Sequence, residues 1–260
     1  MSISSTLVDR AEITFHEAHD ALRPFVGCCW VITAQPDATI RVVPDGSTAI
    51  SIQLQNGQAS EWVLRGPLIR PDERRFTSEA LLVGIRLRPG VAYLLSGTPA
   101  HSMVGRRLTC RDLVAEPPRP ITPEGCIDML QRCLLQRLAG ASLNNVVIAA
   151  LHEIEREHGC VRATDVAARC RVSSRHLHRL MRDWVGYGPK CYANIIRFQS
   201  TLHEMEHVPQ PTAAALASGN GYFDQAHLTQ DLARFAGATP GRLASEAVAD
   251  FSKTRCDDLP

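Results

Sequence analysis

The first third of the chain carries short apolar runs separated by turn-forming residues, a pattern that predicts β-strands. The five runs cover residues 27–34, 40–43, 48–54, 61–64 and 81–87. Pro, Gly, Asn and Asp lie between them, and short strands bounded by such breakers are typical of a sandwich or a barrel. We therefore expect a β-rich N-terminal region, with a short helix over 91–96 after Pro89-Gly90.

The pattern changes from strand to helix after a proline-rich stretch. Residues 115–123 contain four prolines, which lack an amide donor and resist both helices and central strands. Beyond them, 124–138 repeat apolar residues at spacings of three and four, the period of a helix. These features predict a two-domain α+β protein, with a β-rich N-terminal domain and an all-α C-terminal domain.

A weak internal repeat with an offset of 51 residues marks the helical half. Ser173 corresponds to Asp224, and each can cap a helix because its side-chain oxygen accepts an amide hydrogen from the first turn. The other matched pairs are Leu177 and Leu228, Met181 and Leu232, Gly186 and Gly237, and Pro189 and Pro240. Each cap follows a short alanine-rich helix, at 164–170 or 212–218, and a tight connection, which predicts two helix-turn-helix units. A long helix over 191–206 is expected to join them.

The repeat resembles the AraC/XylS family of transcription regulators. Its second copy reads GYFDQAHLTQDL (221–232) and GATP (237–240), and its first reads VSSRHLHRLM (172–181) and VGYGP (185–189). Two positions depart from the family pattern, since Leu232 stands where Phe is usual and Gln230 where a basic residue is common. The N-terminal half is more loosely similar to the sensor domain of one AraC-type subgroup. That similarity lies in PFV (24–26), CW (29–30), VPDG (43–46), GP (66–67) and GIRLRPG (84–90).

The resemblance implies a sequence-specific DNA-binding regulator, controlled by a small effector or by dimerisation through the N-terminal domain. The expected parts are a β-rich sensor or dimerisation domain (1–115), a linker and connecting helix (116–141), an AraC-type double helix-turn-helix domain (142–248) and a flexible tail (249–260). Double-stranded DNA is the expected partner, and a small-molecule effector, a second copy of the chain and RNA polymerase are further candidates. Neither enzyme activity nor a cofactor is expected.

Outward residues of the second helix in each unit are the candidate DNA contacts. The first set is Ser174, Arg175, His178 and Arg179, with Lys190 as a phosphate contact, and the second is Gln225, Ala226, His227 and Gln230. Arginine can donate two hydrogen bonds to the guanine edge, and glutamine suits adenine. The alternatives are an internal brace for Arg179 and an ordinary surface lysine at Lys190. We expect the two helices to enter successive major-groove segments, about 34 Å apart.

Charge is distributed unevenly between the two units, although the whole chain carries only +1. Residues 142–200 hold nine Lys and Arg against five Asp and Glu, whereas 201–246 hold two against five. Because phosphate binding depends on positive charge, the first unit is expected to do more of the electrostatic work.

Cysteine usage and the N-terminus both favour a cytoplasmic location. Nine cysteines without a repeated Cys-x-x-Cys spacing fit a reducing compartment, and the first residues lack a signal-peptide pattern. No apolar run is long enough to span a membrane. Cys28 and Cys29 invite a redox or metal hypothesis, but neighbours on a strand point to opposite faces and cannot easily hold one ion.

Two further sets of residues are candidate ligand sites. His203 and His207 share a helix face, but without an evident third ligand a surface role is favoured, and no metal is expected. Trp30 and Asp45 are candidate ligand contacts, against the plainer interpretations of a core tryptophan and a turn aspartate.

Two alternative functions remain open at this point. Some AraC-like domains are fused to a thiol that accepts alkyl groups from DNA, but this chain has no Pro-Cys-His-Arg run. Cys28-Cys29 and Cys110-Arg111 also lack a flanking base that would activate the thiol. The other alternative is an interaction module in which the acidic second unit binds protein instead of DNA.

Overall fold

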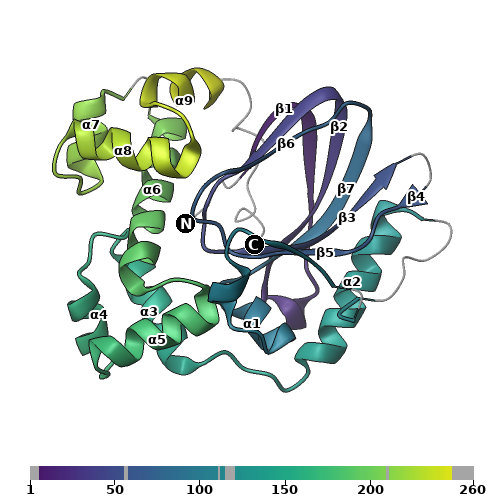
Figure 1. Cartoon of the computed structure of the whole chain (residues 1–260), viewed down its shortest axis with the longest axis horizontal. Coiled ribbons are helices and arrows are strands. Elements are labelled where there is room, and N and C mark those ends of the chain that lie inside the picture. The colour runs from purple at the N-terminus through teal and green to yellow at the C-terminus, as the bar shows by residue number, and fades with distance from the viewer. Residues whose placement is uncertain (1–5, 56–57, 111, 115–120, 209–210, 248–260) are drawn as a thin grey trace.

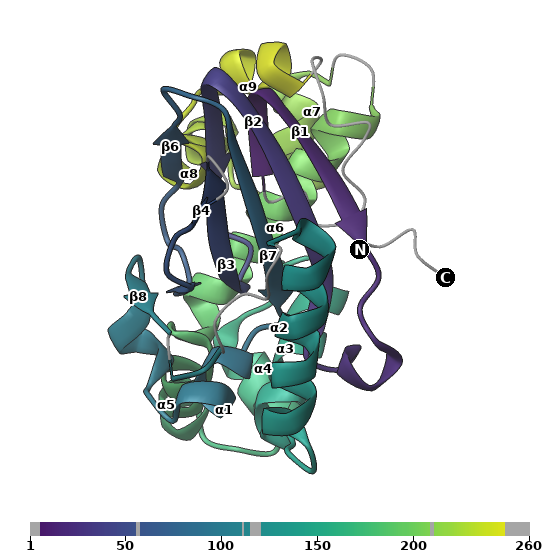
Figure 2. The same cartoon turned by 90° about the vertical axis from the view of Figure 1, so that its right-hand side faces the viewer.

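The β-rich half forms one antiparallel sheet. The computed structural model describes residues 6–55, 58–110, 112–114, 121–208 and 211–247. Its strands are β1 (Thr6–His16), β2 (Val26–Val42), β3 (Thr48–Gln55), β4 (Gln58–Ala59), β5 (Val63–Arg65), β6 (Asp72–Arg75), β7 (Ala80–Leu87) and β8 (Arg107–Thr109). The order is β1-β2-β7-β3-β5-β8, with β4 paired to β3 and β6 paired to β2 (Figure 1 and Figure 2). The predicted β-rich fold is confirmed.

One long bent strand replaces two of the predicted ones. The runs at 27–34 and 40–43 both belong to β2, which pairs with β7 through its first part and with β6 after its bend. The polar residues between the runs resemble a turn in the sequence, but they form a bend in which Asp37 has a φ of 64°. The sheet therefore curls between β7 and β6 and can enclose a cavity.

The two faces of the sheet have different surroundings. The helix α2 (Pro123–Leu138) packs beside β7 and closes one face with Ile127, Leu130 and Leu134 (Figure 2). Cys29 belongs to this core, whereas Cys28 lines the cavity on the opposite face. The expectation that these two thiols point apart is confirmed.

The other half is helical, as predicted. Short helices α1 (Val91–Ser96) and η2 (Ala100–Met103) precede it, and η1 (Asp20–Leu22) lies between β1 and β2. Its helices are α3 (Asn145–Arg156), α4 (Ala163–Arg169), α5 (Ser174–Val185), α6 (Pro189–His207), α7 (Ala213–Gly219), α8 (Gln225–Ala236) and α9 (Pro240–Ala247). The α4–α5 pair lies at one end of α6 and the α7–α8 pair at the other (Figure 1).

The predicted helix caps form as expected. Ser173 Oγ accepts a hydrogen bond from the His176 amide at 3.2 Å, and Asp224 Oδ1 accepts one from the His227 amide at 2.7 Å. Gly186 and Gly237 end the two helices with φ values of 104° and 69°, a region that glycine adopts without steric cost. The start and stop signals of both repeats therefore act at the predicted residues.

Several predictions lie partly outside the described residues. The proline-rich linker includes 115–120, and the polar tail includes 248–260, neither of which the structure describes. Across the described chain, no helix combines the length and the apolar character needed to cross a bilayer.

Gly84 of β7 provides a test of the sheet packing, because the Trp30 ring lies over it. A Cβ added at Gly84 would lie 2.4 Å from Trp30 Cζ2 and 2.8 Å from the Ile50 carbonyl oxygen. We expect Gly84→Ala to lower the free energy of unfolding by about 1–3 kcal/mol, since overpacking forces side chains and backbone to shift. Urea denaturation measures the change. Gly27→Ala is the matched control, because its Cβ would meet its nearest neighbour at 3.7 Å. Equal stability of the two variants would contradict the prediction.

Candidate nucleic-acid interface

The outward face of α5 presents all four of its predicted DNA contacts. Leu177 and Met181 are fully buried and turn one side of α5 into the core. The exposed residues on the other side include Ser174, Arg175, His178 and Arg179. The Arg179 side chain is exposed, and its guanidinium lies 3.2 Å from the ring nitrogen Nδ1 of His176 on the same helix. The buried apolar side of α5 thus turns the polar residues of its first turns toward solvent.

A stripe of basic side chains surrounds these residues. Arg175, Arg179 and Arg182 follow the i, i+4, i+7 spacing of one helix face, and Arg171 and Lys190 lie beyond the two ends of α5. Within the described residues, no carboxylate lies within ion-pair distance of any of these five side chains, all of which are exposed. Arg171 and Arg182 were not among the predicted contacts, although the helical spacing of Arg182 was a usable signal.

The remaining arginines of the first unit are engaged elsewhere. Arg162 pairs with Asp165 at 3.1 Å, and Arg169 bonds to both Glu153 and Glu157 at 2.9 and 2.8 Å. Hydrogen bonds from Arg169 and Arg156 lower the pKa of the Glu153 carboxyl. The positive charge that is not engaged in such pairs therefore concentrates along α5 and at Lys190.

The second unit presents three of its four predicted contacts as exposed residues. Gln225, Ala226 and Gln230 are exposed on α8. His227 differs, because its ring lies edge-on to Tyr222 with centroids 5.3 Å apart, and its side chain is only 39% exposed. The reason is its position four residues before Asp231, which places both on the side of α8 that faces α6.

Asp231 and two other acidic residues of the second unit form contacts inside the protein. Its buried carboxylate lies 3.1 Å from Arg197 Nη2 of α6, and the same guanidinium lies over the Tyr222 ring at 4.5 Å. Glu204 accepts a hydrogen bond from Asn220 Nδ2 at 2.6 Å, and Asp224 caps α8. Three of the five acids are therefore engaged in internal contacts, and the count along the sequence overstates the negative charge on the outward face of α8.

Phe223 is a surface residue that sequence reasoning missed. Its side chain is 92% exposed directly before the Asp224 cap, whereas the adjacent Tyr222 is buried. In the sequence both residues belong to the tight connection before the Asp224 cap, and only the turn before α8 decides which of them packs inside. An exposed apolar ring at this place can contact the methyl group of thymine.

The β-rich half covers the far ends of both outward helices. A Cβ added at Gly186, which ends α5, would lie 2.9 Å from Pro67 Cγ, and one added at Gly237, which ends α8, would lie 3.2 Å from Pro71 Cγ. Trp184 of α5 also packs on Tyr93 of α1, with ring centroids 4.7 Å apart. The connection between β5 and β6 therefore touches the end of each helix and leaves the polar first turns exposed.

Asp45 lies at the junction between the two halves rather than in the large cavity. Its carboxylate is 2.8 Å from Arg86 Nη2 and accepts a hydrogen bond from the Ser47 hydroxyl at 2.7 Å. Burial alone would raise the pKa of Asp45, but the charge of Arg86 and the bonds from Ser47 outweigh it and hold the pKa below its usual range. Next to it, Gln199 Nε2 of α6 donates to the Pro44 carbonyl oxygen at 2.7 Å.

Trp30, the other candidate ligand contact, lines a cavity of about 690 Å³ inside the curled sheet. Apolar walls come from residues such as Ile13, Phe15 and Phe76. The charged residues of the lining are Glu61, Arg65, Asp72, Glu73, Arg74, Arg86 and Arg107. The cavity thus has apolar walls, and four of the seven charged residues in its lining are basic.

Three of the thiols have pKa values shifted away from those of an alkyl acceptor. Burial raises the pKa of the Cys110 thiol to about 12, and it also raises the pKa of Cys126 and Cys191. A nucleophilic thiolate requires the opposite shift. The Cys110 thiol, one of those weighed for the DNA-repair alternative, is therefore shifted away from the nucleophilic form.

Two capped helix-turn-helix units at the ends of one helix place the C-terminal half among the helix-turn-helix proteins. Residues 166–246 match a family described as a helix-turn-helix domain, and residues 14–109 match a domain family of unknown function. The helical half is a helix-turn-helix domain of the AraC type, the class found in DNA-binding transcription regulators, and the predicted resemblance is confirmed.

Structural comparison finds ToxT of Vibrio cholerae with low similarity. ToxT from strain O395 has 8% identity and a TM-score of 0.46, with 93% of this chain and 99% of that chain covered. Its complex with (E)-4-(8-methylnaphthalen-1-yl)but-3-enoic acid has 8% identity and a TM-score of 0.47, with 92% and 100% covered. The unsaturated fatty acid-bound ToxT of strain SCE256 has 11% identity and a TM-score of 0.40, with 94% and 96% covered. A comparison with curated sequences gives no match.

The Asp45–Arg86 pair allows a direct test of the junction. We expect Asp45→Asn to lower the free energy of unfolding at neutral pH by about 3–5 kcal/mol, because Arg86 would lose its partner in a buried site. Since the folded pKa of Asp45 is depressed, its contribution is complete above the unfolded pKa of about 3.9 and is lost as pH falls through the folded value. The difference between the variant and the parent should therefore shrink in acid.

Urea denaturation at several pH values measures this difference. Asp37→Asn is the matched control, because its pair with Arg75 is 58% and 68% exposed and should contribute less than about 1 kcal/mol. An Asp45→Asn effect no larger than that of the control would rule out a stabilising role for the buried pair.

Proposed function

We propose that this protein is a sequence-specific transcription regulator whose two outward helices, α5 and α8, read DNA together. The observation that carries the proposal is the pair of capped helices at opposite ends of α6, each with an exposed polar first turn. The 19 residues of α6 correspond to about 28 Å of helix, close to the 34 Å between successive major-groove segments. Where straight DNA cannot meet both helices, bending of the duplex makes up the difference.

The contacts divide into base readers and phosphate holders. Arg175 and Arg179 are placed to read guanine, with Ser174 and His178 beside them, and Lys190 holds phosphate together with Arg171 and Arg182. On α8 the readers are Gln225, Ala226 and Gln230, with Phe223 added as an apolar contact. His227 mainly supports the packing against α6. The first unit supplies most of the electrostatic attraction, and the second supplies mostly uncharged contacts.

The cavity inside the curled sheet is the proposed effector site. Its lining fits an apolar molecule that carries an acidic group, because Arg65 and Arg74 line the apolar cavity, while Arg86 and Arg107 pair with Asp45 and Asp72. Arg65 and Asp72 line this cavity and also flank the β5–β6 connection that touches the ends of α5 and α8. That connection is a direct path from the cavity to both helices. A second copy of the chain and RNA polymerase are further proposed partners.

Arg175→Ala tests base reading by the first unit. The operator is first obtained by selecting bound sequences from a random duplex library with the full-length protein. We expect the variant to lose about 1–3 kcal/mol of binding free energy and to accept other bases at one position, because the arginine contacts one base edge. Fluorescence anisotropy on a panel of operator variants measures both effects. Arg23→Ala, which removes an exposed arginine of the β-rich half, is the control. Unchanged affinity for every operator in the panel would refute this role of Arg175.

Lys190→Gln tests the phosphate contact separately. Loss of one phosphate contact should weaken binding evenly across operator variants and reduce the slope of log affinity against log salt concentration by about 1. Titrations between low and moderate salt measure the slope. Lys190→Arg keeps the charge and should retain the parent slope. If Lys190→Gln changed preference at one base pair and left the slope alone, the lysine would be a base reader instead.

A further inference from the structure

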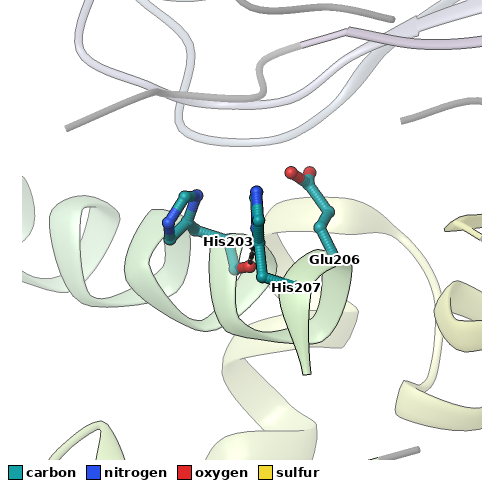
Figure 3. Close-up of side chains that lie close together, drawn as sticks. All are labelled: His203, Glu206 and His207. Atoms are coloured by element: carbon teal, nitrogen blue, oxygen red, sulfur yellow. Dashed lines mark hydrogen bonds between the residues drawn. The ribbon is translucent and has the colours of Figure 1, made fainter. Parts of the chain in front are cut away.

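Three metal-ligating side chains gather on one side of the last turns of α6. One ligand atom each from His203, Glu206 and His207 lies within 4.8 Å of the others (Figure 3). His203 and Glu206 are half-buried, and His207 is exposed. From the sequence, His203 and His207 lacked a third ligand, and the structure supplies it as Glu206. Neither the helix-turn-helix contacts nor the effector cavity uses these residues.

A hydrogen bond fixes the His207 ring in a tautomer that can bind a metal ion. Its Nδ1 lies 2.8 Å from the backbone carbonyl oxygen of His203, an acceptor, so Nδ1 carries the hydrogen of the neutral ring. Nε2 of the same ring then carries the lone pair. A backbone acceptor on the other ring nitrogen is the usual way in which proteins fix the tautomer and orientation of a metal-binding histidine.

The spacing of the three groups suits a small divalent ion. The two imidazole rings lie 4.1 Å apart between centroids, with an angle of 38° between their planes. Zinc holds nitrogen and oxygen ligands at about 2.0–2.2 Å in a tetrahedron, so its ligand atoms lie roughly 3.3–3.5 Å apart. Side-chain rotations of His203, Glu206 and His207 can close the difference from the present spacing. The C-terminal end of a helix also favours a cation, because its last carbonyl groups carry partial negative charge.

We propose that His203, Glu206 and His207 bind one divalent transition-metal ion of the zinc class, with water in the fourth position. Two imidazoles and one carboxylate form a ligand set that zinc uses in proteins. The three side chains point away from the C-terminal helices and toward the pale purple strands of the β-rich half (Figure 3). A bound ion would cross-link two turns of α6 and stiffen the C-terminal end of this helix. This inference is independent of the proposed DNA sequence specificity.

The experiment titrates full-length protein with Co²⁺ and then displaces the cobalt with Zn²⁺. We expect one cobalt per chain, with the visible absorption of nitrogen and oxygen ligands and without the intense near-ultraviolet band of a cobalt–thiolate bond. His203→Ala, His207→Ala and Glu206→Gln should each weaken the affinity at least tenfold. His152→Ala, which removes an exposed histidine from α3, is the matched control and should bind as the parent does.

Thermal unfolding provides a second readout that does not depend on the colour of cobalt. Excess Zn²⁺ should raise the Tm of the parent and of His152→Ala, because an ion that binds only the folded state stabilises it, and it should not raise the Tm of the three site variants. The Tm values without metal show that each variant is folded. A thiolate band, unchanged affinity in either histidine variant, or unchanged affinity in Glu206→Gln would overturn the site.

Discussion

Burial of α6 on almost all sides is the constraint on which the rest of the structure depends. Tyr192, Ile195 and Phe198 are fully buried along it, and polar residues such as Gln199 and Thr201 are buried with them. A helix packed in this way cannot rotate about its axis without breaking contacts on several sides, because close-packed interiors do not deform continuously. Its two ends therefore fix where α5 and α8 lie. The β-rich half is tied to the same helix through the Gln199–Pro44 hydrogen bond.

The parts of the fold that could be predicted from the sequence are those set by local chemistry. A side-chain oxygen at Ser173 or Asp224, and a glycine at Gly186 or Gly237, define the start and end of a helix through contacts within a few residues. The outward side of α5 followed from the apolar stripe, for the same reason. By contrast, β6 (Asp72–Arg75) consists entirely of charged residues and gave no strand signal, because its place in the sheet is determined by pairing with a distant part of β2.

The candidate site could be predicted less completely, because a sequence lists charges without their partners. Asp231 counted as a negative charge near DNA, yet Arg197 lies beside it from another helix, and the same contact draws His227 inward. Arg162 and Arg169 counted as positive charges, yet carboxylates of α3 and α4 accept their hydrogen bonds. What remains on the surface is determined by tertiary pairing. The outward face of α8 therefore carries less negative charge than the count along the sequence implied. The positive charge of the first unit is concentrated more strongly on α5 than that count implied.

The position of the β5–β6 connection explains how one small cavity can affect two separated helices. An effector changes DNA binding only if it binds two arrangements of the protein with different affinity. Strands β5 and β6 contribute Arg65 and Asp72 to the cavity, and the residues between them place Pro67 and Pro71 against the two helix-ending glycines. Glycine at both places allows this close approach, since a side chain would push the connection away. A displacement of this one segment would therefore act on α5 and α8 at the same time, while the hydrogen bond from Gln199 of α6 to the Pro44 carbonyl oxygen opposes any wider separation of the two halves. A coupled change in both outward helices is the mechanical consequence of that placement.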